Sequence, residues 1–442
     1  MPTILLAASA LAPAASRCPL WARSRRVEAA RSAPPPSARG ISAAKMWPKG
    51  GSSPMEASGF GMSSLGRRGG RAASPPGTAT MPSSAPTTAD SNSAAFDWSN
   101  QWYPVHFMDD LDPSKPEQVT VLGRDYVVWR DGAGEWRCFV DLCPHRLAPL
   151  SEGYIDNGNL ECAYHGWEFS GTCKTIPQAP EETMATATGS SRACATPVPV
   201  RVLQNILWVF PGDPSRADSV EPATVPSVDD PTFKENYAMR DLAYGYDTLV
   251  ENVLDPSHVP FAHHGIQGRR EKAAPMAMQC DPPTLGRING KVTNRPVEVE
   301  FIPPCLTCYT FNFPPKKNKD GTPKEGPAKI MHLIAYCVPT RPGHSRILAR
   351  FPRNFFTALL AIKPRWYDHL ERNAVLDGDM VFLHAQERSL RQRDGAQSGW
   401  DKSFYLPCQS DAWVVGFRKW FDKFSGAEVG WAPEVDATLP PK

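Results

Sequence analysis

Two short Cys–His motifs constrain this chain more than any other feature of its sequence. The first is Cys143-Pro144-His145, and the second is Cys162-Ala163-Tyr164-His165. Each motif offers one thiolate and one imidazole, and this pattern matches the ligand set of a Rieske [2Fe–2S] cluster. Thiolates suit a ferric iron, while neutral imidazoles leave the cluster less negative and raise its potential. The motifs therefore predict such a cluster, held by Cys143, His145, Cys162 and His165.

Zinc is the alternative occupant, because two Cys and two His also satisfy a tetrahedral divalent ion. Zinc motifs usually pair Cys with Cys and His with His, whereas each half of this pattern contributes one of each. The spacing favours the cluster and leaves zinc as the second interpretation. Glycines punctuate the segment, as tight loops over a cluster require: Gly153, Gly158, Gly166 and Gly171.

The composition divides the 442 residues into three parts. Residues 1–90 are rich in Arg, Ser, Ala and Pro and poor in acids, which is typical of a plastid transit peptide followed by a linker. A merely disordered tail is the alternative. Residues 96–213 read as short strands around the two motifs and predict an all-β Rieske domain. A Pro- and Asp-rich connector leads to a second domain at 232–430, so the expected fold class is α+β.

A pair of histidines, His258 and His263, opens the second domain. On an unbroken helix they would point about 140° apart and could not share a metal ion. Pro260 interrupts the helix between them and lets both rings turn to one side. With one carboxylate from elsewhere, the pair would form the facial triad of non-haem Fe(II) oxygenases. Two core histidines would look the same, but an upstream Rieske cluster favours the iron site.

The third ligand would come from a distant part of the chain. Asp377 and Asp379 lie on a predicted helix from Arg365 to about Gln392. Asp411 stands where another helix would start, so an N-cap role is its simplest structural interpretation.

Charge, cysteine count and hydropathy limit the remaining possibilities. The net charge of +2 predicts no nucleic-acid partner. Eleven cysteines cannot all pair, and most read as buried thiols of a reducing compartment. Cys305 and Cys308 form a Cys-x-x-Cys motif that could act as a redox switch, although it lacks the usual helix-start context. No apolar run reaches the roughly 18 residues of a membrane span, so we expect no transmembrane span in this chain.

Longer stretches resemble the pheophorbide a oxygenase family of Rieske-type plastid enzymes. This family also includes chlorophyllide a oxygenase and a Rieske component of the inner-envelope translocon. The resemblance runs from about Trp98 to the C-terminus. It is strongest in the stretches 143–153, 244–252, 261–264, 364–367 and 377–380.

The resemblance implies a role for each candidate residue. It implies a helix-grip-like catalytic domain whose mononuclear iron is held by His258, His263 and Asp411. Asp377 and Asp379 then become structural or helix-surface residues. Asp255 would link a cluster histidine of one subunit to an iron histidine of the next, which implies a head-to-tail homotrimer. Ferredoxin would supply the electrons in the chloroplast.

The expected activity is the oxygenation and opening of the pheophorbide a macrocycle with O₂ and ferredoxin electrons. One alternative is hydroxylation of another tetrapyrrole, such as chlorophyllide a or a linear catabolite. Another is an electron carrier in which only the cluster works.

Family members also carry a C-terminal Cys-x-x-Cys and hydrophobic segments, which would begin about where this chain ends at Lys442. We therefore expect, at most, peripheral association with the thylakoid or the inner envelope.

Overall fold

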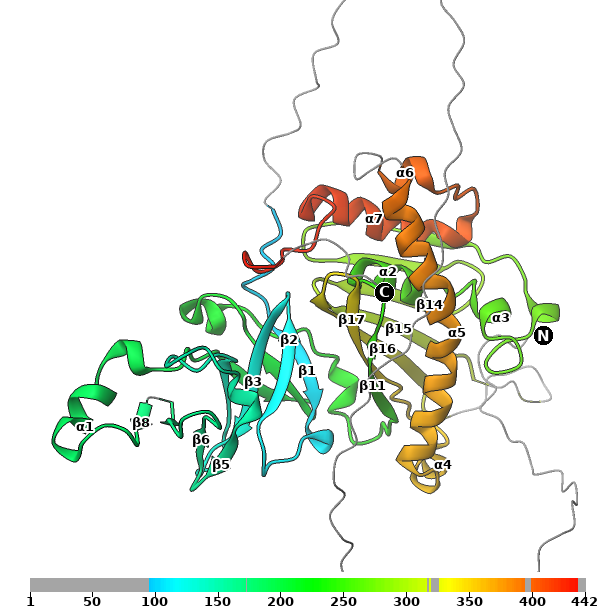
Figure 1. Cartoon of the computed structure of the whole chain (residues 1–442). Helices are drawn as coiled ribbons and strands as arrows, with labels where there is room; N and C mark the ends of the chain where they lie inside the picture. Colours follow the sequence, from blue (N-terminus) through cyan, green and yellow to red (C-terminus); the bar gives the residue numbers. More distant parts are fainter. Residues whose placement is uncertain (1–94, 172, 316–317, 319–325, 394–398, 436–442) are drawn as a thin grey trace, which may run out of the picture. The chain divides into compact units, whose positions relative to one another are not determined.

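The computed structural model describes residues 95–435, apart from 172, 316–317, 319–325 and 394–398. The expected transit segment, 1–90, lies outside the described residues. Helices and strands both occur in the described part, which confirms the expected α+β class (Figure 1). None of its helices has both the length and the apolar character needed to cross a bilayer.

The first module contains two three-stranded antiparallel sheets. One has the order β1-β10-β9, and the other has the order β2-β3-β4. Short strands occur along residues 96–213, as the sequence predicted. Their bounds are β1 Tyr103–Phe107, β2 Glu117–Val121, β3 Arg124–Arg130, β4 Trp136–Val140, β9 Val200–Leu203 and β10 Ile206–Val209.

A third sheet, with the order β5-β6-β7-β8, carries the Cys–His motifs. Its strands are β5 Tyr154–Asp156, β6 Asn159–Glu161, β7 Glu168–Phe169 and β8 Cys173–Thr175, and helix α1, Glu181–Thr188, follows. The lobe has a small hydrophobic core of its own, to which Val127 and Trp129 of β3 contribute. Their neighbours Tyr126 and Val128 point into the main core, because side chains alternate between the faces of a strand.

The second module is built on a seven-stranded antiparallel sheet with the order β11-β17-β16-β15-β14-β13-β12. The central strands β15 and β16 contain unbroken runs of buried residues, which indicates that this part of the sheet is covered on both faces, whereas β13 and β14 alternate buried with more exposed residues. The strands are β11 Tyr237–Leu242, β12 Met278–Cys280, β13 Ile288–Val292, β14 Val297–Ile302, β15 Leu306–Phe313, β16 Lys329–Arg341 and β17 His344–Arg350.

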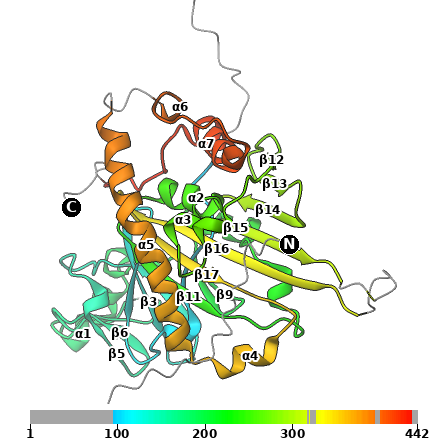
Figure 2. The same cartoon turned by 90° about the vertical axis from the view of Figure 1, so that its right-hand side faces the viewer.

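Three helices pack on this sheet and position the candidate site. Helix α2, Tyr246–Leu254, packs on β16 and β17, and α7, Ala412–Ser425, packs on β12, β13 and α2. The long helix α5, Arg365–Gln392, crosses the sheet beside β11 (Figures 1 and 2). Its bounds agree with the prediction from Arg365 to about Gln392. The short helices are α3 Val259–Ala262, α4 Thr357–Ile362 and α6 Trp400–Ser403.

The two modules share one hydrophobic core. The rings of Trp208 on β10 and Tyr336 on β16 meet edge to face at 5.3 Å. The backbone N–H of Leu122 donates to Pro339 O at 2.9 Å, and Arg346 Nη1 donates to Val105 O at 2.9 Å. The boundaries 96–213 and 232–430 remain predictions, and the core residues of β1 and β10 belong to the same cluster as those of β15 and β16.

Candidate metal centres

The two Cys–His motifs form loops with the same backbone hydrogen bonds. The N–H four residues after each cysteine donates to that cysteine's carbonyl: Leu147 to Cys143 at 2.8 Å, and Gly166 to Cys162 at 2.9 Å. Each cysteine N–H in turn donates to the carbonyl five residues later. Both fourth positions have positive φ, 60° at Leu147 and 69° at Gly166. The loops are therefore structural repeats that present their ligands in the same way.

The sulfur and nitrogen ligands differ in burial. Cys143 and Cys162 are both buried, whereas His145 is exposed and His165 is half-buried. The two imidazole rings lie 4.5 Å apart between centroids. Trp167 stacks on His145 at 4.7 Å with an interplanar angle of 5°, which fixes the orientation of that ring. The structure therefore places the two predicted histidine ligands side by side and the two predicted cysteine ligands next to each other.

The chemistry of these side chains fits an iron–sulfur cluster. Burial, with a smaller contribution from the neighbouring Cys162, raises the pKa of the Cys143 thiol to about 11. A buried thiolate is thus unfavourable at neutral pH unless a cation compensates its charge. Two buried cysteine sulfurs and two more exposed imidazoles make up the donor set of a Rieske centre.

The second candidate site starts where α2 ends. Asp255 is the C-cap of α2, and Pro256 follows, so the helix stops there. The short helix α3 has His258 as its N-cap and His263 as its C-cap, with Pro260 in its first turn. The predicted interruption between the histidines is thus a break between two helices. It turns both rings to one side.

Three side-chain atoms converge at this point. His258 Nε2 and His263 Nε2 lie 3.2 Å apart. Asp379 Oδ1, on the middle of α5, lies 3.7 Å from His258 Nε2 and 3.3 Å from His263 Nε2. Ligands at about 2.1 Å from an ion and 90° apart would lie about 3.0 Å from one another. The triangle is therefore close to the size that a metal ion needs, and two imidazoles with one carboxylate suit non-haem Fe(II).

Asp411, the expected third ligand, lies outside this group of three side chains. It is the N-cap of α7, as its position suggested, but its side chain makes no capping hydrogen bond. Burial and the nearby Asp255 carboxylate raise the pKa of Asp411. Asp379, for which the resemblance implied a structural or helix-surface role, has its side chain buried beside His263.

Asp255 lies next to His258. Its Oδ1 accepts hydrogen bonds from the backbone N–H of Ser257 at 2.7 Å and from the Ser257 hydroxyl. Its Oδ2 lies 3.5 Å from His258 Nδ1, at the limit of a hydrogen bond, so this nitrogen is buried without a well-formed partner. Burial alone would raise the pKa of Asp255, but His258 and Ser257 lower it overall. Burial alone would lower the pKa of His258, and Asp255 raises it. The pair favours an ionised carboxylate beside the imidazole.

A glycine and an arginine place α5 against the histidine loop. A Cβ at Gly378 would lie 3.4 Å from Ala262 O and 3.5 Å from His263 Nδ1, so the helix backbone is in contact with the loop. Arg240 on β11 donates to Asn373 O at 3.0 Å and pairs with Asp377. Asp377 is thus held on the outer side of α5, and Asp379 faces the histidines.

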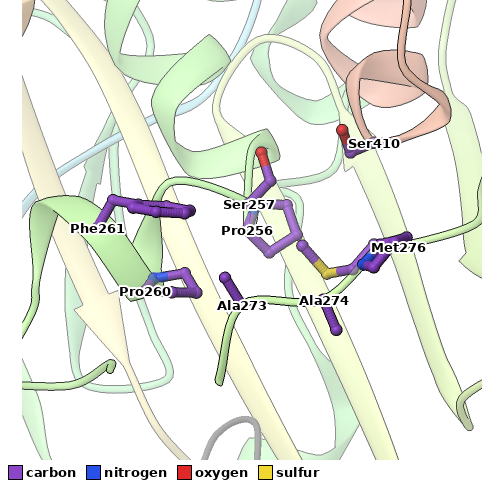
Figure 3. Close-up of a pocket in the computed structure, with 9 residues that line it drawn as sticks. Pro256, Ser257, Pro260, Phe261, Ala273, Ala274, Met276 and Ser410 are labelled. Atoms are coloured by element: carbon purple, nitrogen blue, oxygen red, sulfur yellow. The ribbon is translucent and has the colours of Figure 1, made fainter. Parts of the chain in front are cut away.

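A pocket of about 300 Å³ opens beside Asp255 and His258 (Figure 3). Its lining is mainly apolar, and Phe261 and Met276 are its largest side chains. Ser257 and Ser410 supply the hydroxyl groups on its wall. The complete lining is Pro256, Ser257, Pro260, Phe261, Ala273, Ala274, Pro275, Met276 and Ser410.

Known proteins share both parts of this arrangement. The Rieske [2Fe-2S] domain family matches residues 101–198, and the Pheophorbide a oxygenase family matches residues 301–397. Pheophorbide a oxygenase of Oryza sativa subsp. japonica is 38% identical over 82% of this chain and 72% of the relative. This chain belongs to the pheophorbide a oxygenase family. Flavonoid 8-hydroxylase 2 of Ocimum basilicum is also 38% identical, over 84% of this chain and 74% of the relative.

The family relationship confirms the expected enzyme class and compartment. Members of the pheophorbide a oxygenase family are Rieske-type oxygenases, so this chain is an oxidoreductase with a Rieske [2Fe–2S] domain. The relatives are chloroplastic, and this chain is a chloroplast protein. The fold agrees with a solved structure of dicamba monooxygenase bound to 3,6-dichlorosalicylic acid. That structure has a TM-score of 0.59 and 21% identity, and the match covers 76% of this chain and all of that one.

Three features of this family member were not recognised from its sequence as functional. Asp379, Trp167 and the close contact at Gly378 all depend on packing between distant segments. Asp379 did have a signal: it is three residues after Leu376 and four before Leu383, on the apolar face of α5. In contrast, the proposed Cys305–Cys308 switch is buried, and burial raises the pKa of Cys308 to about 12, which disfavours thiol exchange.

Proposed function

We propose that this chloroplast oxygenase acts on pheophorbide a and opens its macrocycle, with O₂ as oxidant and ferredoxin as electron donor. The convergence of His258, His263 and Asp379 carries the proposal, because an electron carrier would need only the Cys–His loops. The name of the rice relative supplies the substrate. Iron content separates the two classes, with about three irons per subunit for an oxygenase and two for a carrier.

The proposed ligands divide into two sets. Cys143, His145, Cys162 and His165 would hold the [2Fe–2S] cluster, and His258, His263 and Asp379 would hold the mononuclear iron. When bound, these groups supply single-electron transfer and O₂ activation, the chemistry of their ligand types. Asp255 would orient His258 through Nδ1 and so keep Nε2 directed at the iron position.

Surfaces on the two modules support the expected head-to-tail trimer. Leu142, Leu147 and Tyr164 surround the cluster ligands and are all exposed. The apolar pocket beside Asp255 offers a complementary surface on the catalytic module (Figure 3). Contact between these two different surfaces is heterologous, and such contacts form a closed trimer when each subunit is rotated by a third of a turn from the next. In this arrangement Asp255 would link His258 to a cluster histidine of the neighbouring subunit. Light scattering should give three subunits per particle.

A second substrate class has support from the basil relative, whose name is a flavonoid hydroxylase and whose identity is also 38%. The deciding experiment incubates purified protein with reduced ferredoxin and O₂ and offers pheophorbide a, chlorophyllide a, a linear tetrapyrrole and a flavone. We expect a ring-opened, oxygenated product from pheophorbide a, detected by mass spectrometry, and none with Asp379→Asn. Turnover of the flavone alone would replace the proposed substrate.

A further inference from the structure

An exposed apolar surface lies where α4 joins α5. We call its five side chains Phe356, Ile362, Trp366, Tyr367 and Leu370 the α4 tip. Phe356, Ile362 and Trp366 are 64%, 76% and 66% exposed, respectively. Trp366 and Leu370 are four residues apart on α5 and so share one face of the helix. In Figures 1 and 2, α4 and the start of α5 lie together at one end of the second module.

The backbone keeps Phe356 in this position at a cost. Phe356 is the N-cap of α4 and adopts the left-handed conformation, with φ 52° and ψ 31°. Bulky residues rarely occupy this region, and such backbone strain persists only where the surrounding structure holds the residue in place. Phe355, the preceding residue, packs against Phe313 of β15 at 5.3 Å and against Phe356 at 5.5 Å. One aromatic ring thus anchors the segment while the next is exposed.

The chemistry of the α4 tip fits a lipid surface better than a protein partner. Protein interfaces carry about one hydrogen bond per 100–200 Å², which sets the register of the partners. Between Phe355 and Ile362 the only polar side chain is Thr357. Trp366 and Tyr367 combine an apolar ring with a polar group, which suits the boundary between acyl chains and headgroups.

The charges around the α4 tip also suit a membrane. Lys329 lies over the Phe356 ring at 5.7 Å, and Lys363 lies over the Tyr367 ring at 5.6 Å. Lys363 pairs with two acids, Asp368, which is buried behind the tip, at 2.6 Å and Glu371, which is exposed, at 2.5 Å. Bases still outnumber acids by one among the charged residues around it: Lys329, Arg353, Lys363, Arg365 and Arg372 against Asp109, Asp110, Asp368 and Glu371. Anionic headgroups attract such a surface.

We propose that the α4 tip inserts into the interface of a lipid bilayer with anionic headgroups and holds the enzyme on the membrane surface. The α4 tip would then be the part of the protein that makes the expected peripheral contact with the membrane. The inference does not depend on which substrate is oxygenated, because membrane binding is measured without turnover.

Vesicle flotation of the full chain tests the proposal. The probes are phosphatidylcholine vesicles with and without phosphatidylglycerol. We expect binding that increases with phosphatidylglycerol and falls with salt. Ile362→Ser combined with Trp366→Ala should lower the affinity about tenfold or more, since two large apolar groups no longer enter the bilayer. The matched control is Tyr405→Ser, which removes an aromatic ring that is 88% exposed elsewhere and should bind as wild type does.

Circular dichroism and the visible spectrum of the cluster verify that each variant is folded. Equal vesicle binding by wild type and the double variant would overturn the proposal, as would no binding by wild type. Light scattering adds a further outcome. A double variant with fewer subunits and unchanged vesicle binding would show that this surface joins copies of the chain, which also overturns the lipid contact.

Discussion

His263 Nε2 lies 3.3 Å from Asp379 Oδ1, so the loop after α2 and the middle of α5 meet at one point. His258 Nε2 completes the triangle. Each of the three atoms can donate an electron pair to a metal ion, and all three approach from one side. The arrangement leaves the opposite side of the ion position free of these protein ligands, as an oxygenase requires.

Replacing Asp379 should empty the mononuclear site and leave the cluster intact. Asp379→Ala removes the carboxylate, and two histidines alone hold Fe(II) weakly. We expect loss of about one iron per subunit by metal analysis, loss of turnover, and an unchanged Rieske electron paramagnetic resonance signal. Asp377→Ala and Asp411→Ala are the matched controls and should retain iron. Iron lost from Asp411→Ala but kept in Asp379→Ala would restore Asp411 as the ligand.

Replacing Asp255 should separate electron transfer from metal binding. Asp255→Asn keeps the size of the side chain and its hydrogen bonds to Ser257, but it loses the charge that acts on His258. Both metal sites should remain loaded, while oxidation of the reduced cluster by O₂ in the presence of substrate slows by tenfold or more. Single-turnover spectroscopy of the cluster measures this rate. A wild-type rate would leave Asp255 as a helix-terminating residue only.

His332 should contribute a fall in stability at acidic pH. It is half-buried on β16, with Nδ1 3.1 Å from Thr310 Oγ1, and burial lowers its pKa below the usual value of about 6.5. The folded state therefore binds this proton less readily than the unfolded state. The stability that comes from burying neutral His332 is fully present above about pH 6.5. It is lost as the pH falls through the pKa of His332 in the folded state. His332→Gln should flatten the decrease in Tm between about pH 7 and pH 5. Parallel Tm curves for the two proteins would contradict this.

Gly153 should be essential for packing between the cluster loops. A Cβ at this position would lie 2.1 Å from Glu161 O on β6 and 2.9 Å from Leu150 O. Both atoms belong to the backbone and cannot turn away, so Gly153→Ala should destabilise the protein by about 2 kcal/mol or more. Gly286→Ala is the control, because a Cβ there meets nothing within 4 Å, and it should change stability by less than about 0.5 kcal/mol. Thermal unfolding compares the two variants.

The sequence alone was enough to propose the two Cys–His loops as a cluster site, because all four candidate ligands lie close together in the chain. It was also sufficient for α5, whose apolar residues recur with the helical period. It could not decide between Asp377 and Asp379, which point about 200° apart on a helix. Only the packing of α5 on the sheet shows that Asp377 meets Arg240 and Asp379 meets His263. The family resemblance favoured Asp411, whose carboxylate instead lies near Asp255.

The hydrophobic core that both modules share also limits how the enzyme can be cut into separate recombinant fragments. Trp208 and the neighbouring residues of β10 are buried together with Tyr336 and the central strands of the large sheet. A recombinant fragment that stops before residue 232 would leave this aromatic surface in water and would tend to aggregate. Exchange of the cluster-bearing half between relatives would likewise need matching residues on β16. The packing surfaces of the two halves must therefore remain compatible with each other.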